Sequence, residues 1–266
     1  MAKKIAVIFD SAGTLLHMYR VAKESSTGNI LENIESTAIV AQKNGCGLVV
    51  LNTESDIILG SRKDMTLFEF IREHKISLGI SCSRGKFIPA IVNEIIEKET
   101  LFMSDLHDVL EMVTHRCPDI FYLASGLIID SEAKSVSYIL STGGHFFSNT
   151  PQTVQTLQAM KVDTYIASGD GLFALTKLAE FINISQENVF PLSNTFMKES
   201  LVLELKRKYE KVVMVGDGIN DILALRAADV GIMTTQQGDQ RPRKLREAAN
   251  VIIDDIIEVV DVVKKL

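Results

Sequence analysis

The sequence predicts an α/β protein whose core is a doubly wound parallel sheet, with a smaller α/β domain inserted after the first strand. Two observations lead to this fold class. Short apolar runs, typical of strands buried on both faces of a parallel sheet, stand at the N-terminus and throughout the last third of the chain. Helical stretches separate these runs, as right-handed βαβ units require. The middle of the chain has a different pattern and is expected to form the insert.

The expected core strands are brief and rich in Ile and Val. They are Lys4–Phe9, Val162–Ala167, Asn188–Phe190, Lys211–Val215, Val230–Met233 and Val251–Ile253. Helices are expected over Pro151–Met160, Leu172–Phe181, Lys198–Tyr209, Asp221–Ala228 and Asp255–Lys265. In the third of these helices, Leu201, Val202 and Leu205 have the spacing of one buried face. The core domain is therefore expected at residues 1–18 and 147–266.

Residues 19–146 are expected to form the inserted domain. Its helical patterns are Leu31–Lys43, Thr66–Glu73, Ile88–Glu97 and Ser104–Thr114, and its strand-like runs are Leu48–Leu51, Ile120–Leu123, Leu127–Ile129 and Val136–Leu140. The polar turn Asp130–Ser135 separates the last two runs and predicts a β-hairpin.

The composition excludes several classes of protein. Of the 266 residues, 46% are apolar and 23% charged, which is an ordinary globular balance rather than that of a disordered chain. The 28 basic and 34 acidic side chains give 28 − 34 = −6. A mildly acidic chain is a poor candidate for a broad basic surface, so we expect no nucleic-acid partner.

The sequence also disfavours a membrane protein and a protein stabilised by disulfides or zinc. No apolar stretch approaches the roughly 18–20 residues of a membrane span, and Ile5–Phe9 is too short for a signal peptide. The three cysteines, Cys46, Cys82 and Cys117, show no CxxC spacing that would indicate a zinc site or a disulfide framework. We therefore expect a soluble cytoplasmic protein with no membrane partner. No feature of the sequence specifies an oligomeric state.

Four motifs stand at the carboxyl ends of expected core strands, where open parallel sheets bind their ligands. The first is Asp10-Ser11-Ala12-Gly13-Thr14. Asp10 directly follows the first apolar run, and Gly13 allows the next loop to turn tightly. By itself, the motif is equally consistent with an aspartate that only caps local amides.

The second and third motifs suit an anionic ligand. Ser168-Gly169-Asp170 combines a small hydroxyl with backbone amides at the expected start of a helix, an arrangement that binds phosphate oxygens but also occurs in ordinary turns. Lys198 lies in a first helical turn, where the helix dipole disfavours a cation unless it serves another group. Surface lysines are common, so this indication is weaker.

The fourth motif, Gly216-Asp217-Gly218-Ile219-Asn220-Asp221, is the most specific. Two carboxylates and an amide crowd a Gly-rich turn after an apolar strand, and like charges this close repel unless a cation neutralises them. Oxygen ligands with few protein donors suit Mg²⁺. The alternative is that Asp221 caps the helix while Asp217 is solvated.

Taken in order, these motifs resemble the haloacid dehalogenase superfamily of phosphohydrolases and phosphotransferases, and within it the phosphorylation domain of P-type ATPases. The segment KVVMVGDGINDILALRAADVGIM at Lys211–Met233 is similar to the GDGxND hinge of that domain. Lys198–Val202 matches its K-x-x-x-V pattern, and Ser168-Gly169-Asp170 stands where the ATPases carry Thr-Gly-Asp. The likeness covers residues 1–16 and about 148–266. It implies a HAD-like core with a cap-like insert, and a soluble relative of the ATPases rather than an ion pump.

The resemblance implies a role for each matching residue. Asp10 would be the nucleophile that becomes an aspartyl-phosphate. Asp10, Asp217 and the Ala12 carbonyl would hold Mg²⁺, and Asp221 would support that metal site through water or by orienting Asn220. Ser168 and Lys198 would be catalytic by binding the phosphoryl oxygens. The wider phosphate-binding set would be Ser11, Gly13, Ser168, Gly169 and Lys198, with Thr14 in support.

One position departs from the usual phosphatase pattern. Most members of the superfamily carry a second Asp two residues after the nucleophile as general acid and base, whereas this chain has Ala12. General acid–base catalysis is typically worth about 10²–10⁴-fold. The ATPases carry Thr there and the phosphonoacetaldehyde hydrolases carry Ala, so the resemblance leaves ordinary monoester turnover in question.

The leading hypothesis is a Mg²⁺-dependent phosphohydrolase that acts on a small phosphorylated substrate. A second hypothesis is C–P bond cleavage, for which the insert would have to supply a Schiff-base lysine. Its lysines include Lys23, Lys43, Lys63 and Lys86, and no sequence feature distinguishes one of them. A third hypothesis is a regulatory protein that binds phosphate with little turnover. ATP is one possible substrate, although no P-loop is present.

Overall fold

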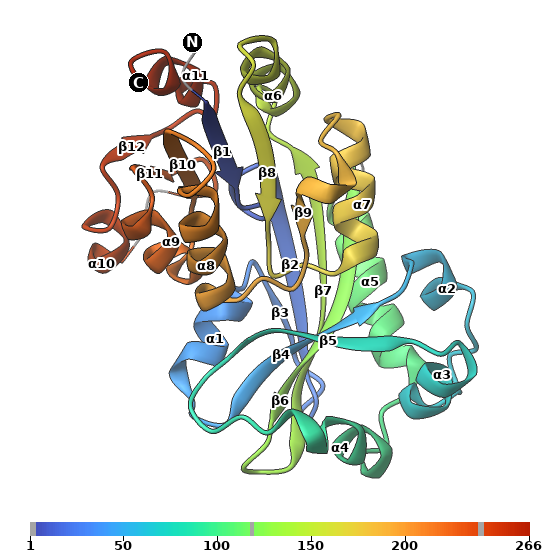
Figure 1. The fold of residues 1–266 in the computed structure, drawn as a ribbon. Coiled ribbons are helices and arrows are strands. Elements are labelled where there is room, and N and C mark those ends of the chain that lie inside the picture. The colour runs from blue at the N-terminus through green and yellow to red at the C-terminus, as the bar shows by residue number, and fades with distance from the viewer. Residues whose placement is uncertain (1–3, 118–119, 239–241) are drawn as a thin grey trace. The chain divides into compact units, whose positions relative to one another are not determined.

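The computed structural model describes residues 4–117, 120–238 and 242–266. The chain divides into two compact units, whose elements are labelled in Figure 1. The core unit comprises the residues up to Met18, His145–Gly169 and Leu175–Leu266, and the inserted unit comprises Tyr19–Gly144 and Asp170–Ala174. Each unit is built around its own six-stranded sheet.

The core sheet is parallel throughout, with the strand order β12-β11-β10-β1-β8-β9 (Figure 1). Its strands are β1 (Ile5–Phe9), β8 (Asp163–Ala167), β9 (Val189–Phe190), β10 (Lys211–Gly216), β11 (Val230–Thr234) and β12 (Val251–Ile253). β1 lies between β10 and β8, and all five of its residues are buried. A strand with neighbours on both edges and helices on both faces needs an unbroken apolar run, so the prediction of a doubly wound parallel sheet is confirmed.

Helices cover the core sheet. They are α6 (Thr150–Ala159), α7 (Leu172–Phe181), α8 (Thr195–Leu205), α9 (Ile222–Ala227), α10 (Arg243–Arg246) and α11 (Glu258–Val263), with 3-10 turns η2 (Gln186–Asn188) and η3 (Ile219–Asp221). On one face, Ala6 and Ile8 of β1 pack with apolar side chains of α8, α9 and α10. The α8 face predicted from helical spacing, Leu201, Val202 and Leu205, is buried in this cluster.

The inserted unit has a second sheet, with the order β3-β2-β7-β6-β4-β5. Its strands are β2 (Leu16–Glu24), β3 (Ile30–Glu32), β4 (Cys46–Asn52), β5 (Ser77–Ser83), β6 (Tyr122–Asp130) and β7 (Ser135–Phe146). The β2–β3, β4–β5, β4–β6 and β6–β7 pairs are antiparallel. β2 and β7 begin or end in the core unit and therefore carry the chain into the insert and back.

Helices α1 (Ser36–Gln42), α2 (Ser55–Leu59), α3 (Leu67–Glu73), α4 (Val92–Lys98) and α5 (Met103–Arg116), with the 3-10 turn η1 (Pro89–Ile91), complete the inserted unit. The longest, α5, buries Leu106, Val109, Leu110 and Val113, which recur with helical spacing. They belong to the main apolar cluster of this unit, together with strand residues such as Val49 and Leu127.

Several local predictions for the insert are wrong. The runs Ile120–Leu123 and Leu127–Ile129 are not separate strands, because β6 is continuous from Tyr122 to Asp130. The helix predicted over Leu31–Lys43 starts only at Ser36, and part of its expected range is the exposed strand β3. β2, β5 and α2 were not predicted. The charged residues of β2 and the five serine, cysteine and glycine positions of edge strand β5 hide the apolar pattern that marks a strand.

The predicted hairpin is confirmed, since Asp130 of β6 pairs with Ser135 of β7. Asp130 holds the connecting turn, because its Oδ1 accepts the backbone N–H groups of Glu132 and Ala133 at 3.0 and 2.9 Å. Lys43 forms an ion pair with its other oxygen. Across the described residues, no helix combines the length and the apolar character that a bilayer crossing requires.

Candidate active site

The loop after β1 places Asp10 at the carboxyl end of the core sheet. The Asp10 N–H donates to the Val215 carbonyl of β10 at 2.9 Å, and only 4% of the residue is exposed. Gly13 has φ = +80°, and a β-carbon there would lie 2.0 Å from Asp217 Oδ2. A glycine is therefore required both by the backbone conformation and by the close approach of the Asp217 carboxylate.

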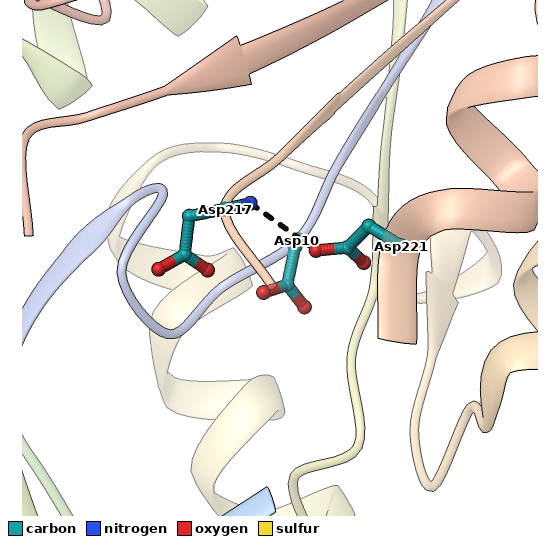
Figure 2. A group of neighbouring side chains, drawn as sticks. All are labelled: Asp10, Asp217 and Asp221. Atoms are coloured by element: carbon teal, nitrogen blue, oxygen red, sulfur yellow. Dashed lines mark hydrogen bonds between the residues drawn. The ribbon is translucent and has the colours of Figure 1, made fainter. Parts of the chain in front are cut away.

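The turn after β10 brings two further carboxylates to this place. Asp217 is 7% exposed and Asp221 is fully buried. Asp221 Oδ2 accepts the backbone N–H groups of Asp217 and Gly218 at 3.2 and 2.9 Å, and Figure 2 shows the first of these bonds. The alternative prediction was that Asp221 caps the helix while Asp217 is solvated. Asp221 does order the turn through these bonds, but Asp217 is buried.

Lys198 of α8 joins the two loops. It is completely buried, and its Nζ donates to Asp10 Oδ1 at 2.6 Å and to Asp221 Oδ1 at 2.7 Å. The N-cap of α8 is Asn194, whose side chain accepts from the N–H groups of Phe196 and Met197. A cation in the first turn opposes the helix dipole, and the two carboxylates offset that cost.

Negative charge exceeds positive charge among these four buried groups. Oxygens of Asp10, Asp217 and Asp221 all lie within 4.8 Å of one another, and Lys198 bonds two of them, Asp10 and Asp221. Burial raises the pKa of Asp10 well above its usual value, and the neighbouring carboxylates raise it further against the opposing effect of Lys198. Burial alone would lower the pKa of Lys198, but Asp10 and Asp221 outweigh burial and hold that pKa above its usual range.

These residues fit a hard divalent cation. Three clustered carboxylates with one ammonium leave a formal excess of two negative charges when all are ionised, and carboxylate oxygens are the ligands that Mg²⁺ prefers. The absent side chain of Gly13 gives the Asp217 carboxylate room beside the Asp10 loop. A cation bound there would relieve the repulsion that raises the pKa of Asp10.

The second strand-end motif meets the first. Ser11 Oγ lies 2.6 Å from Ser168 Oγ, and the two residues are 0% and 2% exposed. The Ser168 N–H donates to the Phe190 carbonyl of β9, and the Ser168 carbonyl accepts from the N–H of Ser193. The structure therefore brings the candidate phosphate-binding serines to the same edge of the sheet as Asp10.

The remaining predicted residues lie in the same loops. Ala12 forms an isolated parallel bridge with Leu16, and Gly169 is half-buried beside Ser168. Thr14 is fully buried, and its hydroxyl has no hydrogen-bond partner among the described residues. Asn220 is half-buried, with its amide oxygen close to Gly218.

Sequence reasoning missed two contributions to this arrangement. Asn194 caps α8, which starts at Thr195 rather than at the predicted Lys198, and so sets the position of Lys198; the available signal was an Asn in the polar segment before the predicted helix. The bond from Lys198 to Asp221 was also missed, and no local signal marks it because it depends on how α8 packs beside η3.

A buried aspartate at the end of the first strand, paired with a lysine and with the acidic Gly-rich turn, defines a class of hydrolase. The family model of haloacid dehalogenase-like hydrolases matches residues 6–229, and the chain belongs to this family. It is 30% identical over 265 residues to a soluble P-type ATPase-like phosphatase from Methanocaldococcus jannaschii, an alignment that covers 99% of this chain and 94% of that protein. The chain is therefore a hydrolase of the phosphatase kind.

Parts of larger proteins are similar as well. A copper-transporting ATPase of Saccharomyces cerevisiae is 36% identical over 113 residues, which cover 38% of this chain and 11% of the pump. Among solved structures, a zinc-transporting PIB-type ATPase in its E2.Pi state gives a TM-score of 0.49 at 16% identity, covering 98% of this chain and 41% of that one. The sequence match to the copper pump confirms the predicted resemblance to P-type ATPase domains, and this chain spans 11% of the length of that pump.

Proposed function

We propose that this phosphatase is Mg²⁺-dependent and acts on a small phosphorylated substrate through an aspartyl-phosphate on Asp10. The observation that carries the proposal is the buried Lys198, which bonds Asp10 and Asp221 within 2.7 Å while Asp217 lies beside them. A nucleophile for phosphorus needs an ionised oxygen, an adjacent cation and protection from bulk water. Lys198 supplies the cation and burial supplies the protection, and bound Mg²⁺ would favour the ionised form of Asp10.

Asp10, Asp217 and the Ala12 carbonyl would hold Mg²⁺, with Asp221 in a supporting position. Both oxygens of Asp221 already accept hydrogen bonds, from Lys198 and from the backbone N–H groups of its own turn, which favours support over direct ligation. Bound Mg²⁺ would supply positive charge against the phosphoryl oxygens.

Asp10 performs the covalent step. One of its carboxylate oxygens forms a bond to phosphorus as the bond from phosphorus to the leaving group breaks, and the leaving group departs with the electron pair and takes a proton from water. Water then attacks the phosphorus of the aspartyl-phosphate, inorganic phosphate leaves, and the Asp10 carboxylate is regenerated. Two displacements replace one harder one.

The phosphoryl group would be held by residues of three strand ends. Lys198 neutralises its charge, and Ser168 donates a hydrogen bond at the start of the loop that follows β8. The other residues that we assign to this role or to its support are Ser11, Gly13, Gly169, Thr14 and Asn220. A cytoplasmic location is part of the proposal, and the three free cysteines are compatible with a reducing compartment.

The contacts of the insert do not favour C–P bond cleavage. A Schiff base forms from a neutral amine, so its lysine needs a lowered pKa. Lys23, Lys43 and Lys63 instead pair with Asp or Glu side chains, and these contacts raise the pKa of each ammonium. Burial opposes the rise at each of the three lysines.

The substitution Asp10→Asn tests the proposal. With p-nitrophenyl phosphate and Mg²⁺, the variant is expected to lose turnover by a factor on the order of 10³ or more, because an amide cannot replace the nucleophilic oxygen. Rapid acid quenching should trap a phosphoenzyme from the wild type and none from the variant. Asp105→Asn is the matched control, since this carboxylate also bonds a lysine but belongs to the inserted unit. Substantial turnover by Asp10→Asn would remove Asp10 as nucleophile.

A further inference from the structure

Ser11 and Ser168 face each other because of the register of the core sheet. β1 pairs with β8 in parallel, and the last pairs are Ile8 with Tyr165 and Phe9 with Ile166. The same offset, continued two residues beyond the last of these pairs, sets Ser11 opposite Ser168. Their hydroxyl oxygens are 2.6 Å apart, so one hydroxyl donates to the other.

Both serines stand on backbone that is held in place. The Ser11 carbonyl accepts the N–H groups of Thr14, Leu15 and Leu16 at 3.3, 2.9 and 3.0 Å. The Ser168 backbone is bonded on one side to the Phe190 carbonyl at 3.2 Å and on the other to the Ser193 N–H at 2.8 Å. With both residues at most 2% exposed, bulk water has little access to the hydroxyl pair.

The direction of this hydrogen bond matters for an anionic ligand. Each hydroxyl has one hydrogen and two lone pairs. A fully ionised phosphoryl group only accepts, so Ser168 must use its single hydrogen to bind it. The bond between the serines can then persist only if Ser11 donates and Ser168 accepts.

We propose that Ser11 is a positioning residue that acts through Ser168. Resting on the proposed function, the inference is that Ser11 donates to Ser168 Oγ and thereby turns the Ser168 hydrogen toward the phosphoryl group on Asp10. A hydroxyl that accepts one hydrogen bond becomes a stronger donor of the next, so the chain from Ser11 through Ser168 strengthens the contact with the anion. Ser11 needs no side-chain contact with the substrate for this effect.

A double-mutant cycle tests this coupling. We would compare the wild type, Ser11→Ala, Ser168→Ala and the double variant for kcat/KM with p-nitrophenyl phosphate and for inhibition by orthovanadate, both with Mg²⁺. Ser168→Ala is expected to lower kcat/KM and to raise the inhibition constant of orthovanadate, each by about 10- to 100-fold, as loss of a hydrogen bond to a charged group does. Ser11→Ala should weaken both by about 3- to 10-fold, because a neutral hydrogen bond contributes less.

The decisive value is that of the double variant. Its kcat/KM and its inhibition by orthovanadate should equal those of Ser168→Ala within about twofold, because Ser11 has no hydroxyl left to orient once Ser168 is removed. Ser11→Thr, which keeps a donor, should recover most of the loss. Ser131→Ala is the matched control: its buried hydroxyl donates to the Gly45 carbonyl of the inserted unit at 2.8 Å, so its loss should lower the melting temperature with little change in either measurement.

Additive losses would overturn the inference, since they would show that Ser11 acts independently of Ser168. An unchanged Ser11→Ala variant would also overturn it. In both cases a wild type that hydrolyses p-nitrophenyl phosphate and is inhibited by orthovanadate leaves the proposed function intact. A wild type that does neither would overturn the proposed function and this inference together.

Discussion

Lys198 in the core unit and Lys23 in the inserted unit each donate to two carboxylates at nearly the same distances. Lys198 bonds Asp10 and Asp221 at 2.6 and 2.7 Å, and Lys23 bonds Asp105 and Asp108 at 2.8 and 2.7 Å. Their surroundings differ. The Lys198 side chain is 0% exposed and that of Lys23 is 17% exposed. The contacts alone therefore do not distinguish the proposed catalytic group from a surface ion-pair network.

Burial and a third carboxylate make the difference. Water screens the Lys23 group, and its negative charge is solvated. In the core, water is excluded and a third carboxylate, Asp217, lies within 4.8 Å of the two that Lys198 bonds. Clustered buried carboxylates are costly for folding alone, but they are the ligands that a divalent cation requires.

Two buried carboxylates show the same contrast. Burial would raise the pKa of both Asp10 and Asp130, and each pairs with a lysine. Asp10 lies among other carboxylates, and its pKa is raised. Asp130 accepts backbone N–H bonds from Ala133 and Glu132, and with Lys43 these outweigh burial and lower its pKa. The Asp130 site is thus a satisfied structural turn.

Removing the metal is expected to have the largest effect of the tests that follow. In excess chelator the hydrolysis of p-nitrophenyl phosphate should fall by a factor on the order of 10³, because several kcal/mol of charge stabilisation is lost. Mg²⁺ at 100 times its Kd should stabilise the wild type by about 2.7 kcal/mol. Asp217→Asn should abolish this Mg²⁺-induced shift in melting temperature, whereas Asp108→Asn should retain it. Equal activity with and without chelator would contradict the metal site.

Replacing each lysine with Met measures how much burial changes the contribution of its ion pairs. Lys198→Met leaves buried carboxylates without their cation, so urea denaturation should show a loss of about 3–5 kcal/mol in the free energy of unfolding. Its kcat/KM should fall at least about 100-fold, since a charge-assisted contact to the phosphoryl group is lost. Lys23→Met should cost less than about 1 kcal/mol. Similar losses for both variants would show that burial does not separate the two groups.

Ala12 limits the choice of leaving group. Because its side chain offers no proton, acyl and aryl phosphates should be hydrolysed faster than alkyl monoesters, and the phosphoenzyme should be long-lived. Ala12→Asp should raise alkyl-ester hydrolysis by about 10-fold if the new carboxylate reaches the leaving group. The leaving-group preference of the wild type is the cleaner measurement. Equal rates for alkyl and aryl esters, with no trapped phosphoenzyme, would mean that another residue supplies the proton.

Asp130→Asn should have the smallest effect and depends on pH. The folded-state pKa of Asp130 is lowered, so its contribution to stability is present above the unfolded-state pKa of about 3.9 and is lost as the pH falls through the folded value. At pH 7 the variant should be less stable by about 1 kcal/mol. This difference should shrink below about pH 4. A constant difference from pH 7 to pH 3 would show that the charge of Asp130 is not responsible.

Local sequence patterns predicted the core well and the insert less well. Core strands such as β1 are buried on both faces, so their apolar runs are unbroken. In the insert, β2 has polar and charged residues between buried ones, and edge strand β5 starts with an exposed serine. The pairing partners of these strands were needed to identify them, because a half-exposed strand resembles a polar loop over a few residues.

Local sequence is enough to predict which residues gather at the proposed catalytic edge. Asp10, Ser168 and Asp217 each follow a parallel strand, and the carboxyl ends of parallel strands share one edge of a sheet. Gly13 was likewise readable, because a tight turn requires positive φ. The bond from Lys198 to Asp221 and the hydrogen bond between Ser11 and Ser168 could be identified only from the folded structure. These contacts depend on helix packing and strand register, which arise from long-range side-chain packing that no local pattern of residues encodes.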